Sequence, residues 1–265
     1  MKIVAIANQK GGVAKTTTAI NLAASLAENG RKVLVVDMDP QGNASTGFGI
    51  GLDQRAQTVY DLLLGDANAS SVVLQTTTDN VYIIPSTTEL SSSDVQLYNV
   101  NKRSFLLRDS LSGADLQALS FDYALIDCPP SLNLLTVNAL VAANSVLIPL
   151  QSEFFALEGL SQLMLTIREI RQTANPDLRV EGVLLTMHDQ RNNLSQQVEK
   201  DARDTLGGLV YKTVIPRNVR LSEAPSFAIP ALTYDPTSKG SVAYRSFAQE
   251  FLVNNRDSAK VAEHG

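Results

Sequence analysis

The segment from residue 2 to residue 30 constrains the possible folds more than any other part of the chain. A short β-branched apolar run, KIVAIA, leads directly into the turn NQKGGVAKTT. An alanine-rich helical pattern follows over residues 16–29 and stops at Gly30. Backbone N–H groups at the start of a helix converge on one place and carry partial positive charge. The order of strand, glycine turn and helix therefore predicts an anion site at the end of a buried strand.

The turn departs twice from the standard phosphate-loop pattern G-x-x-x-x-G-K-[ST]. Counting back from Lys15 and Thr16, the pattern requires glycine at positions 14 and 9, where this chain has Ala14 and Gln9. Taken alone, the glycines and the lysine fit a phosphate site and a plain strand-to-helix turn with a solvated lysine equally well. The strand before the turn, the helix after it and the run KTTT favour the phosphate site.

Further apolar runs alternate with helical patterns along the chain. The predicted strands are 2–7, 32–37, 81–85, 123–127, 145–150, 180–186 and 211–216. The predicted helices are 16–29, 59–64, 102–111, 134–143, 157–173, 194–206 and 241–253. This alternation predicts an α/β fold, a single domain with a mostly parallel sheet of about seven strands that helices cover on both faces. We expect residues 1–254 to form the domain and residues 255–265 to form a polar C-terminal tail.

Composition excludes several classes of protein. The 265 residues are 44% hydrophobic and carry a net charge of −5, so any contact with nucleic acid must come from a local basic patch. The single cysteine, Cys128, excludes a disulfide framework or a multi-cysteine metal site within one chain. The N-terminal stretch is too quickly polar for a signal peptide, and no run approaches the roughly 18 apolar residues of a membrane span. We therefore expect a cytoplasmic protein.

Two acidic segments come at the ends of predicted strands. VVDMDPQGN carries Asp37 and Asp39, and YALIDCPPS carries Asp127. An aspartate at the tip of a buried parallel strand is well placed to hold Mg²⁺ or to orient an attacking water molecule. Any one of them alone is more typical of a cap on the next helix or loop. Three aspartates at strand ends, together with the phosphate loop, favour the catalytic interpretation.

Five separated segments resemble the ParA/Soj family of chromosome- and plasmid-partitioning ATPases. They are KGGVAKTTT, DMDPQGN, LIDCPPSLNLLTVNAL, EFFALEGL and IPRNVRLSEAPS, in the family's order and over nearly the whole chain. The family has a deviant Walker A loop, K-G-G-x-G-K-[ST]-[ST], in which the early glycine is not required, so Gln9 is no objection. The resemblance implies a P-loop NTPase fold, weak basal ATP hydrolysis with ATP and Mg²⁺, and a homodimer that buries two ATP molecules between its subunits.

The resemblance also implies roles for individual residues. Lys10 matches the lysine that reaches the partner subunit's phosphates, Lys15 contacts the terminal phosphates of its own nucleotide, and Asp39 positions the hydrolytic water. Thr16 and Asp127 hold Mg²⁺, and Asp37 assists them. The residues expected to bind the nucleotide are Gly11, Gly12, Val13, Ala14, Lys15, Thr16, Thr17, Pro216, Arg217 and Asn218, the last three beside the adenine.

Members of the family bind double-stranded DNA without sequence preference once ATP has joined two subunits, which requires Arg and Lys directed at phosphates. Arg191 and Arg220 match family positions implicated in that contact, and Lys200, Arg203 and Lys212 lie near them in sequence. Because acidic residues are interleaved, charge alone would support only a solvated mixed face. The resemblance implies nucleoid association and a ParB-like centromere-binding partner that stimulates hydrolysis and releases the dimer.

The chain departs from the family at two places. Ala14 replaces a glycine whose N–H lies against the phosphates. Because the position opens a predicted helix, we expect a negative φ that alanine tolerates, but a methyl group that weakens ATP binding, slows hydrolysis or blocks dimerisation. Ala228 and Ile229 stand where the family usually has Gly-Lys, which predicts slightly weaker DNA binding or a weaker salt dependence.

Three other functions compete with this interpretation. A MinD-like positioning ATPase for another cargo reaches lipid through a C-terminal amphipathic helix, whereas this chain ends NNRDSAKVAEHG without an apolar face, so no membrane contact is expected. A nitrogenase-iron-protein-like reductase needs two cysteines in each subunit, and only Cys128 is present. Ala14 keeps open a nucleotide-impaired ParA-like module that binds DNA or a partner.

Overall fold

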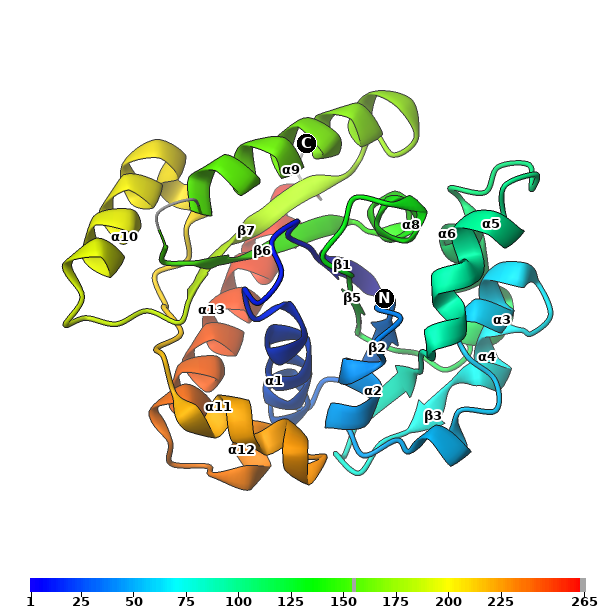
Figure 1. The fold of residues 1–265 in the computed structure, drawn as a ribbon, viewed down its shortest axis with the longest axis horizontal. Helices are drawn as coiled ribbons and strands as arrows, with labels where there is room; N and C mark the ends of the chain where they lie inside the picture. Colours follow the sequence, from blue (N-terminus) through cyan, green and yellow to red (C-terminus); the bar gives the residue numbers. More distant parts are fainter. Residues whose placement is uncertain (154–155, 263–265) are drawn as a thin grey trace.

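One mostly parallel sheet organises the computed structural model, which describes residues 1–153 and 156–262 (Figure 1). Within those ranges seven strands are hydrogen-bonded in the order β3-β4-β2-β5-β1-β6-β7. All neighbouring pairs are parallel except β3 with β4. The strands are β1 (Lys2–Ile6), β2 (Val33–Asp37), β3 (Leu74–Gln75), β4 (Val81–Ile84), β5 (Tyr123–Asp127), β6 (Ser145–Gln151) and β7 (Arg179–Thr186). The predicted α/β class is confirmed.

Helices cover both faces of the sheet, as predicted. Successive strand residues alternate between two apolar cores: Ala5 and Ile126 lie in one, and Val4 and Leu125 in the other. Helices α3, α6, α8 and α9 close the first core, and α1 and α13 close the second (Figure 1). The longer helices are α1 (Lys15–Glu28), α8 (Leu134–Ala142), α9 (Ala156–Thr173), α10 (Asn193–Leu206) and α13 (Lys239–Ala262).

Short helices and 3-10 turns fill the connections. They are α2 (Asn43–Gly47), η1 (Leu52–Gln54), α3 (Val59–Leu64), α4 (Ala69–Val72), η2 (Thr88–Ser92), α5 (Ser93–Gln96), α6 (Leu106–Leu111), α7 (Ala114–Gln117), η3 (Gly207–Leu209), α11 (Val219–Glu223), η4 (Ala224–Phe227) and α12 (Ala231–Tyr234). No helix in the described part of the chain is both long and apolar enough to cross a membrane.

The predicted strand 211–216 is wrong. The segment makes only isolated bridges to its neighbours, with hydrogen bonds from Tyr211 N to Val183 O and from Ile215 N to Leu185 O. The backbone N–H and C=O groups that would extend a strand ladder form hydrogen bonds with side chains instead. Arg203 donates to the carbonyls of Tyr211 and Lys212. Glu250 accepts from the N–H groups of Lys212 and Thr213. The seventh strand is β3, whose two residues are too few to show a period in sequence.

Two helices also differ from prediction in their bounds by more than one residue. The helix predicted from residue 102 begins only at Leu106, because Lys102 has a φ of 57°, which no helix accommodates. The last helix, α13, starts at Lys239 and passes the predicted end at residue 253 to reach Ala262. The predicted tail is therefore helical as far as Ala262, and residues 263–265 lie outside the described ranges. A domain boundary after residue 254 stays a prediction.

Candidate functional site

The central strands bring the predicted acidic residues to one edge of the sheet. Asp37 at the end of β2 lies in register with Asp127 at the end of β5, and Asp127 lies in register with Ile6 at the end of β1. The turn of residues 8–17, here called the phosphate turn, leaves β1 at that point. A cavity of about 390 Å³ opens there. It is lined by Gly11, Gly12, Ala14, Lys15, Thr16, Thr17, Asp39, Gln41, Asn43, Pro130 and Met187.

The phosphate turn is fixed from several sides. Thr186 at the end of β7 donates its hydroxyl to the carbonyl of Val13 at 3.1 Å. Lys15 is buried, and its ammonium donates to the carbonyl of Lys10 at 3.1 Å, so the side chain curls back over the turn. Burial lowers the pKa of Lys15, against the opposing charges of Asp127 and Asp39. A buried ammonium with one carbonyl partner is suited to take up an anion.

Ala14 has a left-handed backbone, with φ 68° and ψ 33°. The expectation of a negative φ is wrong, because Ala14 is the cap that precedes the first helical residue, Lys15, and keeps the conformation of the turn. The left-handed region costs a residue with a β-carbon about 1–2 kcal/mol, which glycine avoids. Alanine is therefore strained here even before any ligand is considered.

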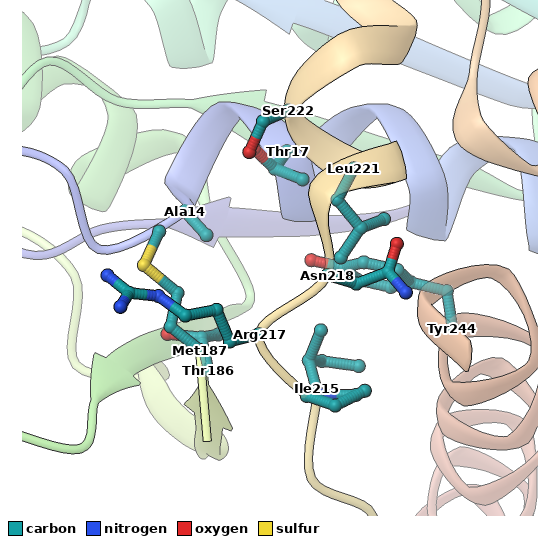
Figure 2. Close-up of a pocket in the computed structure, with 11 residues that line it drawn as sticks. Ala14, Thr17, Thr186, Met187, Ile215, Arg217, Asn218, Leu221, Ser222 and Tyr244 are labelled. Atoms are coloured by element: carbon teal, nitrogen blue, oxygen red, sulfur yellow. The ribbon is translucent and has the colours of Figure 1, made fainter. Parts of the chain in front are cut away.

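A second cavity, of about 230 Å³, adjoins the phosphate turn (Figure 2). Its lining residues are Ala14, Thr17, Thr186, Met187, Ile215, Pro216, Arg217, Asn218, Leu221, Ser222 and Tyr244. All three residues predicted beside the adenine are among them. Figure 2 shows Met187 lying against Ala14, and these two residues border both cavities. No pattern in the sequence pointed to Met187 or Tyr244, which β7 and α13 bring in from distant segments.

The two buried aspartates differ in their partners. Asp37 accepts hydrogen bonds from the N–H and the hydroxyl of Ser45, at 2.8 and 2.7 Å, yet burial raises its pKa to about 6. Neither carboxylate oxygen of Asp127 has a hydrogen-bond partner of good geometry among the described residues, although the Thr16 hydroxyl lies near enough to favour its charged form. Burial raises the pKa of Asp127 well above its usual range, with the charge of Asp37 adding and Thr16 opposing. Two neighbouring buried carboxylates, one of them with few compensating contacts, are suited to share a cation.

These residues fit a magnesium ion that phosphate groups help to hold. Mg²⁺ takes oxygen ligands and uses one or two carboxylates together with water and substrate phosphates. The unpartnered oxygens of Asp127 and the hydroxyl of Thr16 meet that description, with Asp37 beside them. The described ranges contain no cluster of three or more His, Cys, Asp or Glu that would hold a metal by protein ligands alone.

The predicted DNA-binding residues lie on α10, on α11 and in the connections beside them. Figure 1 shows α10 and α11 on the same side, with the connection that follows β7 between them. Arg191 in that connection is 92% exposed, and its Nε lies 3.4 Å from Asp189. It lines a groove of about 720 Å³ together with Arg217 and Lys239. We call this the basic groove. Lys239, at the start of α13, was missed because it lies far from the others in sequence.

Three of the other four predicted DNA-binding residues have ion-pair partners within the chain. Arg220 bonds Glu223 at 2.8 Å and lies 3.3 Å from Asp235. Lys200 pairs with Asp204 at 3.6 Å, and Lys212 is exposed. Arg203 bonds Glu199 at 2.9 Å while holding the carbonyls of Tyr211 and Lys212, which is a structural use of its guanidinium. Arg191, whose ion-pair partner is the nearby Asp189, and Lys212, whose ammonium makes no ion pair with any described residue, are thus the most available of the five.

Comparison with known proteins decides the family. A family model described as an AAA domain matches residues 1–180. The chain is 52% identical over 263 residues to the chromosome partitioning protein ParA of Caulobacter vibrioides, covering 99% of this chain and 98% of that one. It is 50% identical over 253 residues to the sporulation initiation inhibitor protein Soj of Bacillus subtilis, covering 96% and 99%. The chain belongs to the ParA/Soj family.

Solved structures agree with this ParA/Soj assignment. A Mycobacterium smegmatis protein named cobyrinic acid a,c-diamide synthase, with bound ATP analog and magnesium, superposes with a TM-score of 0.83 at 36% identity, covering 97% of both chains. The cell division ATPase MinD of Pyrococcus furiosus gives 0.77 at 27% identity, covering 94% of this chain and 97% of that one. The fold is therefore that of the P-loop NTPases. The relatives with the higher sequence identities, ParA at 52% and Soj at 50%, support the assignment to the partitioning family.

Lys10, in the phosphate turn, forms an ion pair within the chain. The ammonium of Lys10 lies 2.7 Å from Glu153, which follows β6 in the family-like segment EFFALEGL. Both side chains are well exposed, at 38% and 49%. Phe154 and Phe155 of that segment lie outside the described residues. An exposed pair of this kind contributes only about 0–1 kcal/mol, so little holds Lys10 in place.

The buried aspartates predict an unusual pH dependence of stability. A carboxyl whose folded pKa is raised destabilises the folded state progressively as pH rises through that pKa. For Asp37, with a pKa of about 6, we expect the nucleotide-free ParA/Soj chain to lose stability between pH 5 and pH 7. The expected loss is about 1 kcal/mol. Urea unfolding of the wild type and of Asp37→Asn at both pH values measures it. Asp37→Asn should not show this loss of stability. An identical pH dependence in the two proteins would contradict the assignment of the loss to Asp37.

Proposed function

We propose that this chain is a DNA-partitioning ATPase that works as an ATP-dependent homodimer in the cytoplasm, on the nucleoid. ATP and Mg²⁺ join two subunits, the dimer binds double-stranded DNA without sequence preference, and a ParB-like centromere-binding partner stimulates hydrolysis and releases it. The observation that carries the proposal is a single cavity in which the phosphate turn meets Asp39 and Lys15, beside the unpartnered carboxylate of Asp127.

Several residues in and beside the cavity have a task that their position supports. The N–H groups of Gly11 and Gly12 face the phosphates, and Lys15 exchanges the carbonyl of Lys10 for a phosphate oxygen. Thr16 and Asp127 would hold Mg²⁺, which would supply positive charge beside the phosphate oxygens. Asp39 lines the same cavity and orients the attacking water.

Lys10 acts across the dimer. Its ammonium leaves Glu153 and meets the phosphates of the partner subunit, where a positive charge stabilises the transition state. The exposed pair with Glu153 opposes this movement by only about 0–1 kcal/mol. The buried phosphates of a sandwich dimer offer a far stronger partner than a half-exposed carboxylate.

DNA binding rests on the basic groove. Arg191, Arg217 and Lys239 surround it, and the dimer presents two copies to one duplex, which compensates for the overall charge of −5. Arg220 adds a contact after it releases Glu223. Arg203 is proposed only as a support for the segment that carries Lys212.

The test combines ATP hydrolysis with salt-titrated DNA binding. ATP turnover should rise when DNA and a ParB-like partner are added together. In Arg191→Ala the slope of log affinity against log salt should fall by about 2, because each phosphate contact contributes about 0.9 and a dimer carries two copies. Arg108→Ala is the matched control, since Arg108 is also exposed beside an aspartate but lies on α6. Equal slopes in both variants would remove the basic groove from the proposal.

A second candidate is a ParA-like module that binds DNA or its partner without effective ATP turnover. The strained Ala14, which borders both cavities, favours it. ATP-independent DNA binding by the wild type, with no turnover even in the presence of the partner, would select this alternative.

A further inference from the structure

Arg55 is a buried arginine for which neither the sequence nor the proposed chemistry gives a role. Only 7% of its surface is exposed. Its Nη1 donates to the carbonyl of Ser86 at 2.9 Å, and its Nη2 donates to the hydroxyl of Thr46 at 2.8 Å and to the carbonyl of Ile50 at 2.7 Å. Among the described residues no carboxylate forms an ion pair with it. A buried charge that bonds only to neutral groups is costly, and its bonds fix whatever they reach.

Arg55 forms these bonds with, and next to, the segment that carries Asp39. We call residues 39–48, which run from the end of β2 through α2, the Asp39 segment. Gly42, within it, has a φ of 62°, and a β-carbon there would overlap Nη1 of Arg55 and approach the Ser86 carbonyl within 2.8 Å. The turn before Gly42 closes on Asp39 itself, through a bond from Gly42 N to Asp39 O at 2.9 Å. The guanidinium therefore packs directly behind the turn that presents Asp39.

The same contacts connect to the buried carboxylate of Asp37. The hydroxyl of Ser45 donates to Asp37 at 2.7 Å and accepts the N–H of Ser86 at 3.2 Å. The carbonyl of Ser86 is in turn held by Arg55. The Asp39 segment is thus fixed at Ser45 from the metal side of the cavity and at Thr46 from the side of Arg55.

We propose that Arg55 is a positioning residue for ATP hydrolysis, which holds the Asp39 segment so that Asp39 faces the phosphate cavity. The inference rests on the proposed role of Asp39. Misplacement of a catalytic group by about 1 Å can cost about 100-fold in rate, so a buried support of this kind affects turnover more than binding. None of the hydrogen bonds of the Arg55 guanidinium described here reaches the phosphate turn, on which ATP affinity is expected to depend.

The test compares Arg55→Met with Arg245→Met. Arg245 also fixes two elements, through two bonds to Glu28 and one to the carbonyl of Pro236. Glu28 ends α1, about 20 Å from the phosphate turn at 1.5 Å per helical residue. Single-turnover hydrolysis, ATP affinity and amide hydrogen exchange of residues 41–48 are measured in each variant. Arg55→Lys is included because a lysine restores the charge but not the fork of donors.

For Arg55→Met we expect turnover to fall at least about tenfold, ATP affinity to stay within about threefold, and exchange of residues 41–48 to rise about tenfold. Arg55→Lys should recover only part of the rate. Arg245→Met should lose stability and leave all three quantities unchanged. Turnover and affinity that fall together with global stability in Arg55→Met would overturn the proposal, as would unchanged exchange of residues 41–48.

The exchange measurement separates this inference from the proposed function. If Asp39→Ala leaves turnover unchanged, the role of Asp39 fails whatever Arg55→Met does. If the chain has no measurable turnover, faster exchange confined to residues 41–48 in Arg55→Met still supports Arg55 as the anchor of the Asp39 segment, and unchanged exchange rejects it.

Discussion

Asp39→Ala is expected to lower ATP turnover at least about 100-fold while ATP affinity changes by no more than about threefold. Asp39 lines the phosphate cavity, accepts only the N–H of Gln41 at 2.9 Å, and makes no ion pair with any described residue. Its carboxylate is therefore available to orient water, whereas the contacts that hold the phosphates come from Lys15 and the phosphate turn. Single-turnover hydrolysis and equilibrium binding of Mg-ATP measure the two quantities.

Asp53→Ala provides the matched control for Asp39→Ala. Asp53 is an exposed aspartate in η1, shortly after the Asp39 segment, and does not line the cavity. Its loss should leave turnover unchanged. If Asp39→Ala weakens ATP binding as strongly as it slows turnover, Asp39 contributes to magnesium binding and does not orient the attacking water.

Ala14→Gly is expected to strengthen ATP binding at least about tenfold and to stabilise the protein by about 1 kcal/mol. Relief of the left-handed strain at φ 68° gives the stability. Removal of a methyl group that borders both cavities gives the affinity. For a chain of this size the stability change corresponds to a rise in melting temperature of about 2–4 °C. Thermal unfolding and ATP titration check the two effects.

The chain supplies its own control for that substitution. Ala228 also has a left-handed backbone, with a φ of 57°, and it borders neither cavity. Ala228→Gly should give a similar stabilisation with no change in ATP affinity. If both variants are stabilised and neither binds ATP more tightly, the methyl group of Ala14 does not obstruct the nucleotide, and the nucleotide-impaired alternative loses its support.

The sequence predicted those parts of the fold and site that depend on local pattern. Apolar runs separated by helical patterns predicted the sheet. Asp37, Asp39 and Asp127 were located because strand ends are recognisable in the sequence. The φ of Ala14 was predicted wrongly because a residue beside a helix start belongs either to the helix or to the turn, and the pattern does not distinguish them. Segment 211–216 has the composition of a strand, but Arg203 and Glu250 take its backbone groups.

The parts that could not be predicted depend on contacts between distant segments. Tyr244 lies on the last helix and reaches the second cavity only because α13 packs against α1, where its hydroxyl bonds Thr18 at 3.1 Å. The position of α13 also places Lys239 in the basic groove with Arg191. Arg55 is one charged residue in a polar stretch, and nothing near it in sequence indicates that it is buried.

Pro216 and Arg217 border both the cavity beside the phosphate turn and the basic groove. A single short segment thus forms a common wall between the two, so that, under the proposed function, the two binding equilibria would be linked through it. Thermodynamic linkage is reciprocal, so the factor by which ATP increases the affinity for DNA equals the factor by which DNA increases the affinity for ATP. A subunit already on DNA would then recapture nucleotide more readily than one in free solution, and residence on DNA would itself favour the ATP-bound state.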